Sequence, residues 1–316
     1  MAESKNVETN RNYVQIIPLR RFVSERDIVV RGCKIRKFSE KEKHKLRNSE
    51  ALKLAWSEAE ISTLDFHFVI ESAYGNALLA SDIIAALRIF KPFAVSTSPP
   101  IGLEIRNGDV VHVAHVGLFG ALYDMTNGAV YTLSEKETKE FEEFCKLFFK
   151  VIDFAYMRTA INRFSNAYQK GFAGDRLVDY VIALEALFSE NSENIGYKLC
   201  LRVPMFLGIC AEVGERIRIR EFVKIAYEIR SGIVHGSQDP ARLFPKKMDE
   251  LNIRLEKLLQ NTHPINKQNF FSEFFLPEIR EITRKAIYEF IVQSESNKTL
   301  ILKTIDNALL RTEKLT

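Results

Sequence analysis

The pattern of apolar and polar residues changes near residue 134. Before that point, short apolar runs are separated by polar turn residues, which is typical of β-strands. After it, apolar residues recur at steps of three and four, which places them on one face of a helix, and no run indicates a strand. We therefore expect an α+β protein, long enough for two cores, with a flexible polar tail at 1–12, a mixed strand and helix domain at 13–133 and an all-α domain at 134–316.

The first domain is expected to contain several strands and one helix. Strands are expected at 14–19, 27–30, 33–38 and 64–71, a helix at 81–91, and a hairpin of 101–106 and 109–119 around an Asn-Gly turn. Ser81 is expected to cap the helix, and His67, between two phenylalanines, is expected to be packed. His112 and His115 lie in the second hairpin strand on opposite faces, so we expect no shared metal ion there.

The second domain is expected to be a bundle of about six helices joined by short loops. Ser134 and Glu137 form a capping box that opens a helix expected to continue to about residue 170. Asp175 is expected to cap the next helix, and Pro204 to kink the following one or to lie in its first turn. The remaining helices are expected at 175–190, 197–210, 221–236, 242–260 and 277–293.

Composition narrows the classes of function. The formal net charge of +4 permits an RNA partner without requiring one. The four cysteines, at 33, 145, 200 and 210, form no CxxC pair and are expected to be free thiols in a reducing cytosol. A polar N-terminus and the lack of a long apolar run predict no signal peptide and no membrane partner, so we expect a cytoplasmic protein. The sequence has no glycine-rich phosphate loop, nucleophile elbow or Cys/His cluster, so no metal and no cofactor are expected.

Basic residues gather among the first predicted strands. On one face of a sheet they can contact the phosphates of RNA. The alternative is a solvated face without a ligand. The candidate RNA contacts are Arg20, Arg21, Arg31, Lys34, Arg36 and Lys37.

The segment 221–236, EFVKIAYEIRSGIVHG, combines a predicted helix with two chemically useful side chains. Arg230 supplies a cation for phosphate, and His235 supplies a group that gains or loses a proton near neutral pH. The alternative is an ordinary helix end, where basic residues complement the negative end of the helix dipole. Arg106 and His112 form a similar pair in the predicted hairpin, so spacing alone does not distinguish the two.

Four segments around this one occur in the order of a known family. They read INRFSNAYQKGFAGD, DRLVDYVIALEALFS, YKLCLRVPMFLG and YEIRSGIVHG, and they span about residues 160–240. Over these residues the chain resembles the Apea-like branch of the HEPN superfamily, with the last predicted helix as a looser extension. The resemblance implies an all-α HEPN bundle that forms a homodimer. For residues 1 to about 155 we recognise no such resemblance.

HEPN proteins commonly act as metal-independent ribonucleases in toxin–antitoxin, abortive-infection and anti-phage defence systems. Their R-x4-6-H signature falls here on Arg230 and His235, whereas Ser231 departs from the Asn, Asp or His that often follows the arginine. The resemblance thus implies an endoribonuclease that cleaves RNA, such as tRNA or mRNA, with an antitoxin or defence-system partner and with the N-terminal half as a sensing or RNA-binding module. The alternative is a non-catalytic HEPN module that binds RNA or nucleotide, or a regulatory partner of another toxin component.

In the implied mechanism Arg230 holds the scissile phosphate and His235 moves a proton to or from the ribose oxygens. The products are a 2′,3′-cyclic phosphate and a 5′-hydroxyl, and DNA is not cut. Residues five apart on a helix differ by about 140° in direction, so convergence requires a long reach of Arg230, a loosened helix at Gly232 or a second protomer. Ser231 bonds either to phosphate or to a helix carbonyl, and Tyr227 either stacks on a base or belongs to the core or the dimer interface.

Three more residues of the matched segments are candidates for supporting roles. Glu185 and Asp179 lie on one predicted helix, and Glu185 stands among apolar neighbours. Glu185 either orients the catalytic pair or bonds to a helix end. Arg202 either adds positive charge to the cleft or forms a buried ion pair with Glu185.

Overall fold

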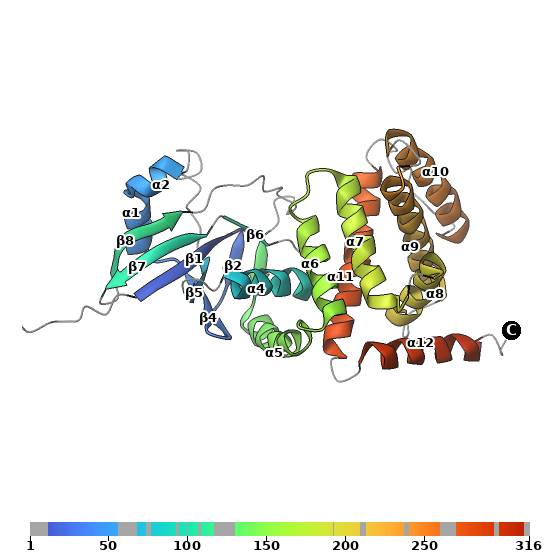
Figure 1. The fold of residues 1–316 in the computed structure, drawn as a ribbon, viewed down its shortest axis with the longest axis horizontal. Helices are drawn as coiled ribbons and strands as arrows, with labels where there is room; N and C mark the ends of the chain where they lie inside the picture. The colour runs from blue at the N-terminus through green and yellow to red at the C-terminus, as the bar shows by residue number, and fades with distance from the viewer. Residues whose placement is uncertain are drawn as a thin grey trace, which may run out of the picture. The chain divides into compact units, whose positions relative to one another are not determined.

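The computed structural model describes residues 12–55, 68–73, 77–92, 95–98, 100–106, 109–116, 130–191, 193–208, 213–236, 240–259, 270–293 and 297–312. The chain divides into two compact units, residues 1–145 and 146–316 (Figure 1). The first contains an antiparallel sheet with helices and the second contains helices, so the fold is α+β. The boundary between the two units along the chain falls within helix α5 (Glu135–Val151), whereas the sequence pattern placed it just before this helix begins.

The first unit is built on a sheet that, within the described residues, has seven strands in the order β3-β4-β5-β1-β7-β8, with β6 pairing with β1. Strand β1 is central and pairs antiparallel with β5, β6 and β7. The strands are β1 (Asn12–Arg20), β3 (Ile28–Val30), β4 (Cys33–Lys37), β5 (Phe68–Ala73), β6 (Ser96–Thr97), β7 (Ile101–Arg106) and β8 (Asp109–Val116). The strands expected at 14–19, 27–30 and 33–38 and the β7–β8 hairpin are confirmed. His67 lies outside the described residues.

Three strands and two helices of this unit were not predicted from the sequence, and one of the three strands is β6. The strands β2 (Phe22–Ser24) and β9 (Tyr131–Leu133) pair in parallel, which requires partners far apart in the chain. The helices α1 (Glu40–Arg47) and α2 (Glu50–Ala55) cover one face of the large sheet. They and the strands share one apolar cluster, formed by Ile16, Phe38, Leu46, Leu52, Val69, Ile101, Leu103, Val110 and Val113.

Both α1 and α5 begin with the same four residues, SEKE. In α1 the backbone N–H of Glu42 donates to Ser39 Oγ and the backbone N–H of Ser39 donates to Glu42 Oε2, at 3.3 and 3.0 Å. Ser134 and Glu137 make the same exchange at the start of α5, as expected. The helix expected at 81–91 starts about one turn earlier as α4 (Ala77–Phe90), so Ser81 is an exposed interior residue and not its cap.

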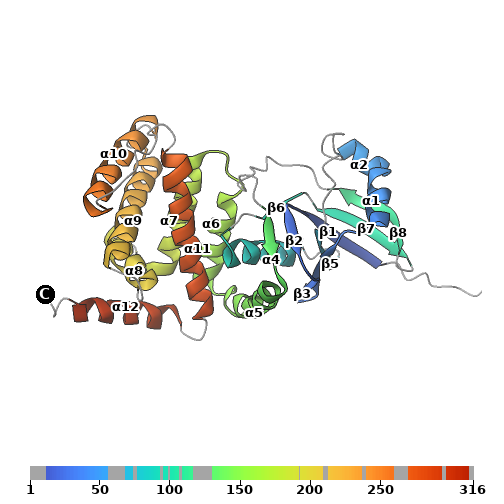
Figure 2. The same ribbon diagram turned by 180° about the vertical axis from the view of Figure 1, so that it is seen from behind.

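The second unit is a bundle arranged around α7, which contacts α6, α8, α9 and α11. A helix with neighbours on several sides is apolar on several sides, and buried residues of α7 run from Gly174 to Phe188. Figure 2 shows α12 crossing one end of the bundle. The helices are α6 (Ala155–Ala167), α7 (Ala173–Phe188), α8 (Ile195–Leu207), α9 (Val213–Val234), α10 (Pro240–Leu259), α11 (Leu276–Val292) and α12 (Lys298–Thr312), with a π-helical turn at Phe271–Phe275.

Several helices of this unit differ from the expected ones, including the helix expected at 221–236, which begins at Val213. The single helix expected to reach residue 170 is two, because the chain turns at 152–154 and Phe154 has an extended backbone. The spacing of buried residues also changes there, because the next buried residue after Ile152 is Met157. Residues five positions apart lie on different faces of one straight helix. The helix expected to begin at Asp175 begins at Ala173, and α12 was not predicted at all.

Candidate active site

Helices α7 and α9 bring Glu185 and Arg230 together. Arg230 Nη2 donates to Glu185 Oε2 at 3.1 Å, and the side chains are only 19% and 14% exposed. The two residues are 45 positions apart in sequence, so their contact depends on the packing of α7 against α9. Of the roles considered for Glu185, this geometry supports that of holding Arg230.

The pair is only partly satisfied by hydrogen bonds. Glu185 Oε1 and Arg230 Nε are both buried, and neither has a hydrogen-bond partner among the described residues. Burial raises the pKa of Glu185, and the charge of Arg230 opposes this rise without cancelling it. The ionised carboxylate is therefore disfavoured by its surroundings, and the buried N–H of Arg230 Nε has no acceptor among the described residues.

This raised pKa predicts a pH dependence of stability. A carboxyl group whose pKa is higher in the folded state stabilises the fold below its unfolded pKa of about 4.3, and that contribution is lost as the pH rises through the folded pKa. The glutamine of Glu185→Gln cannot ionise, so this variant does not lose that stability as the pH rises. We expect the free energy of unfolding of Glu185→Gln, relative to wild type, to increase between pH 4 and 7 in urea denaturation. A difference that stays constant or decreases would contradict the burial effect.

His235 lies at the end of α9 with its side chain exposed. Its backbone N–H donates to the carbonyl of Ser231 at 3.1 Å, and Gly236 follows with φ +61°, a left-handed conformation suited to glycine at a helix end. The helix is regular up to Val234, so loosening at Gly232 is not observed. Gly232 is buried, and a Cβ there would lie 2.7 Å from Leu243 Cδ2 on α10, so glycine allows this close packing.

Two supporting candidates have different partners from those considered. Arg202 does not pair with Glu185: its Nε and Nη2 donate to Asp306 at 2.9 and 2.7 Å, and its Nη1 donates to the carbonyl of Phe188. Asp179 is 3% exposed and accepts from Arg163 Nη1 at 3.0 Å. Arg202 thus joins α8 to α12, and Asp179 joins α7 to α6.

Tyr227 packs against α8. A Cβ at Gly196 would lie 2.6 Å from its ring, so glycine allows this close approach. Ser231 is half-buried, and its carbonyl accepts the N–H of His235. Arg163 and Asp306 were missed as partners because nothing in the local sequence indicates contacts across the bundle.

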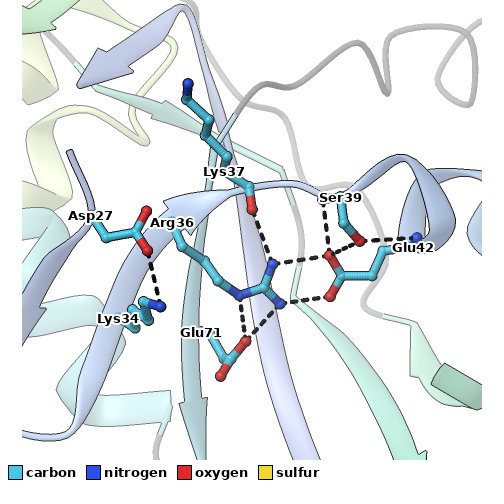
Figure 3. A network of polar contacts seen from close by, with 7 residues as sticks. All are labelled: Asp27, Lys34, Arg36, Lys37, Ser39, Glu42 and Glu71. Atoms are coloured by element: carbon cyan, nitrogen blue, oxygen red, sulfur yellow. Dashed lines mark hydrogen bonds and ion pairs between the residues drawn. The ribbon is translucent and has the colours of Figure 1, made fainter. Parts of the chain in front are cut away.

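In the first unit, Arg36 is part of an ion-pair network (Figure 3). Its Nη1 and Nη2 donate to Glu42 at 2.9 and 2.6 Å, its Nε donates to Glu71 at 2.6 Å, and Nη1 also reaches the carbonyl of Lys37. Burial alone would lower the pKa of Arg36, but the bonds to both carboxylates outweigh it and raise the pKa. Arg36 therefore binds α1 to the sheet, and its donors are taken up by the protein and not left for RNA.

The other basic candidates differ from Arg36 in their contacts or in their exposure. Lys34 pairs with Asp27 at 2.9 Å, with both side chains almost half exposed. Arg20 donates to Ser98 Oγ at 3.3 Å. Arg21, Arg31 and Lys37 are exposed, and the first two have positive φ angles of 50° and 46°. Arg31 occupies the two-residue turn between β3 and β4 together with Gly32, at φ +81°, which suits a tight hairpin.

No described helix is both long and apolar enough to cross a membrane. Across the part of the chain that the structure describes, no three His, Cys, Asp or Glu side chains are grouped to hold a metal ion. His112 is exposed on β8, and the side chains of Arg106 and His115 lie outside the described residues. The chain matches no protein family, no curated protein and no solved structure in the comparisons made.

Proposed function

We propose that the second unit is a metal-independent endoribonuclease of the HEPN type, from the Apea-like branch, and that it acts as a toxin or anti-phage defence effector. The observation that carries the proposal is the arrangement at one end of α9. A guanidinium is held by one bond to a carboxylate with a raised pKa, and an exposed imidazole follows at the end of the same helix.

These groups supply what RNA cleavage needs. Arg230 binds a non-bridging oxygen of the scissile phosphate and stabilises the charge that develops on it. His235 takes the proton of the ribose 2′-hydroxyl, whose oxygen bonds to phosphorus, or gives a proton to the 5′-oxygen as its bond to phosphorus breaks. Glu185 limits the positions open to Arg230. The products are a 2′,3′-cyclic phosphate and a 5′-hydroxyl.

A second copy of the chain brings a His235 side chain close to Arg230. Because α9 is regular, Arg230 and His235 point about 140° apart on one protomer. A two-fold arrangement of α9 ends places His235 of one copy beside Arg230 of the other. We infer a homodimer with a composite site, an RNA substrate such as tRNA or mRNA, an antitoxin or other defence-system partner, and a sensing or RNA-binding role for the first unit.

A second candidate function is a non-catalytic module that binds RNA or a nucleotide. It is favoured by the contact between Arg230 and Glu185, since a guanidinium already engaged by a carboxylate binds phosphate more weakly. The two functions differ in whether bound RNA is cleaved.

The test is incubation of the purified protein with total RNA in EDTA, followed by analysis of the new RNA ends. We expect cleavage to 2′,3′-cyclic phosphate and 5′-hydroxyl ends. A matched oligonucleotide with 2′-deoxyribose at the cleaved position is expected to bind and remain intact. RNA that stays intact, including with extract from phage-infected cells as trigger, would rule out the nuclease, and binding without cleavage would favour the second function.

A further inference from the structure

The C-terminal end of α7 is capped by side chains from two other helices. A helix end leaves carbonyl groups without intrahelical donors, and glycine in a left-handed conformation commonly resolves this. Here the residue after α7 is Ser189 with an extended backbone. Lys298 Nζ donates to the carbonyls of Ala186 and Ser189 at 2.7 and 2.5 Å, and Arg202 Nη1 donates to the carbonyl of Phe188 at 2.7 Å.

Lys298 is the first residue of α12, and this helix is docked at two points. Its Asp306 accepts both bonds from Arg202, and Ile301, Leu302 and Ile305 are buried beside α8. The Nζ of Lys298 also lies 5.5 Å from the ring centroid of Tyr156 on α6. Burial lowers the pKa of Lys298, because the charged ammonium group loses contact with water, and its two bonds to backbone carbonyls replace part of that hydration.

The capped turn carries the acidic member of the candidate site. Glu185 directly precedes Ala186, and its carbonyl accepts the N–H of Ser189 at 3.0 Å, so it belongs to the last turn of α7. Helix ends fray unless their carbonyls are satisfied. The carboxylate of Glu185 has one bond to Arg230, and small changes of that turn alter both its distance from Arg230 and its exposure.

We propose that Lys298 is a positioning residue of the candidate site, which holds the last turn of α7 and through it the carboxylate of Glu185 against Arg230. The assignment of a site to this pair rests on the proposed function, but the hold on Glu185 is measurable without RNA. In this arrangement α12 is a structural support of the site from outside the four matched segments.

The test follows the side-chain carboxyl carbon of Glu185 by NMR during a pH titration of the full chain. In Lys298→Met we expect the last turn of α7 to loosen and to admit water. Because burial is the larger cause of the raised pKa, this lowers the pKa of Glu185 toward about 4.3. Amide hydrogen exchange at Ser189 is expected to become at least about tenfold faster, since a bond from a charged donor is lost.

Three variants separate positioning from other effects. Lys298→Arg keeps the charge and is expected to restore most of the wild-type titration. Asp306→Asn weakens the ion pair with Arg202, which is the other anchor of α12, at a partly exposed position. We expect it to lower the pKa of Glu185 by less than Lys298→Met does, and it remains usable where Lys298→Met folds poorly. Lys303→Met, an exposed position of the same helix, is expected to change nothing.

Two outcomes would overturn the proposal. A pKa of Glu185 that rises in Lys298→Met would show only the loss of a nearby positive charge, and an unchanged pKa would show that Lys298 supports α12 alone. Where wild type cleaves RNA, Lys298→Met is expected to cleave roughly tenfold to a hundredfold more slowly. Absence of cleavage by wild type would overturn the proposed function and leave the titration to decide the positioning role.

Discussion

Replacing Arg36 with methionine is expected to lower the free energy of unfolding of the first unit by about 3 kcal/mol, because removal of one partner leaves buried opposite charges uncompensated. Glu42 is 10% exposed and Glu71 is 28% exposed. Burial alone would raise the pKa of Glu42, and its bonds with Arg36 and Ser39 lower it instead. Without the guanidinium, Glu42 must either stay charged in a poor environment or bind a proton, and α1 loses its attachment to β4 and β5.

The measurement is native-state hydrogen exchange of α1 and β4 with increasing urea, which reports on the first unit separately. Lys34→Met is the matched control, because Lys34 lies on the same strand and its pair with Asp27 is almost half exposed. Exposed pairs contribute about 0–1 kcal/mol. Equal losses for both variants would contradict the structural role of Arg36 and restore it as a candidate ligand contact.

His235→Ala is expected to slow RNA cleavage by about 10²- to 10⁴-fold, the usual effect of removing a general acid or base. His235 is the cleaner position to test because its side chain is exposed after the end of α9, so little stability is expected to be lost. Arg230→Ala is also expected to remove the proposed activity, but it leaves the buried Glu185 without its cation, and loss of stability is then expected to contribute.

His112→Ala is the control for this prediction. His112 is exposed on β8 and belongs to the other Arg–His pair of the sequence. We expect its cleavage rate to equal that of wild type. Equal losses in both variants, or full activity in His235→Ala with a dimer intact by light scattering, would exclude His235 from the reaction.

Local patterns were sufficient for most of the strands and helices. The alternation in β1 and the Asn-Gly hairpin of β7 and β8 depend on neighbours in the chain, and so does the capping box at Ser134. The same SEKE sequence at Ser39 was not recognised as a helix start, because EKEKHKLR has almost no apolar spacing. That helix depends on Leu46 in the sheet core and on the bond from Arg36 to Glu42.

The sequence named the residues of the candidate site but did not predict which of them contact one another. The sequence supplied Arg230, His235 and Glu185 as candidates, but it left open whether Glu185 pairs with Arg230 or with Arg202. The structure pairs it with Arg230 and gives Arg202 to Asp306, 104 positions away. The change of helix phase at 152–154 and the docking of α12 were likewise decided by which surfaces pack together.

By itself, the sequence determined the α+β division, most strand and helix positions and the chemical groups of the candidate site. Backbone hydrogen bonding and the periodicity of apolar residues act over a few neighbouring positions, so these features are present in short segments. Only the tertiary structure decided the partners of Arg36, Arg202 and Glu185 and the capping of α7 by Lys298. A charged group bonds to whichever opposite charge or carbonyl packing brings within about 3 Å, and that distance is a property of the whole fold.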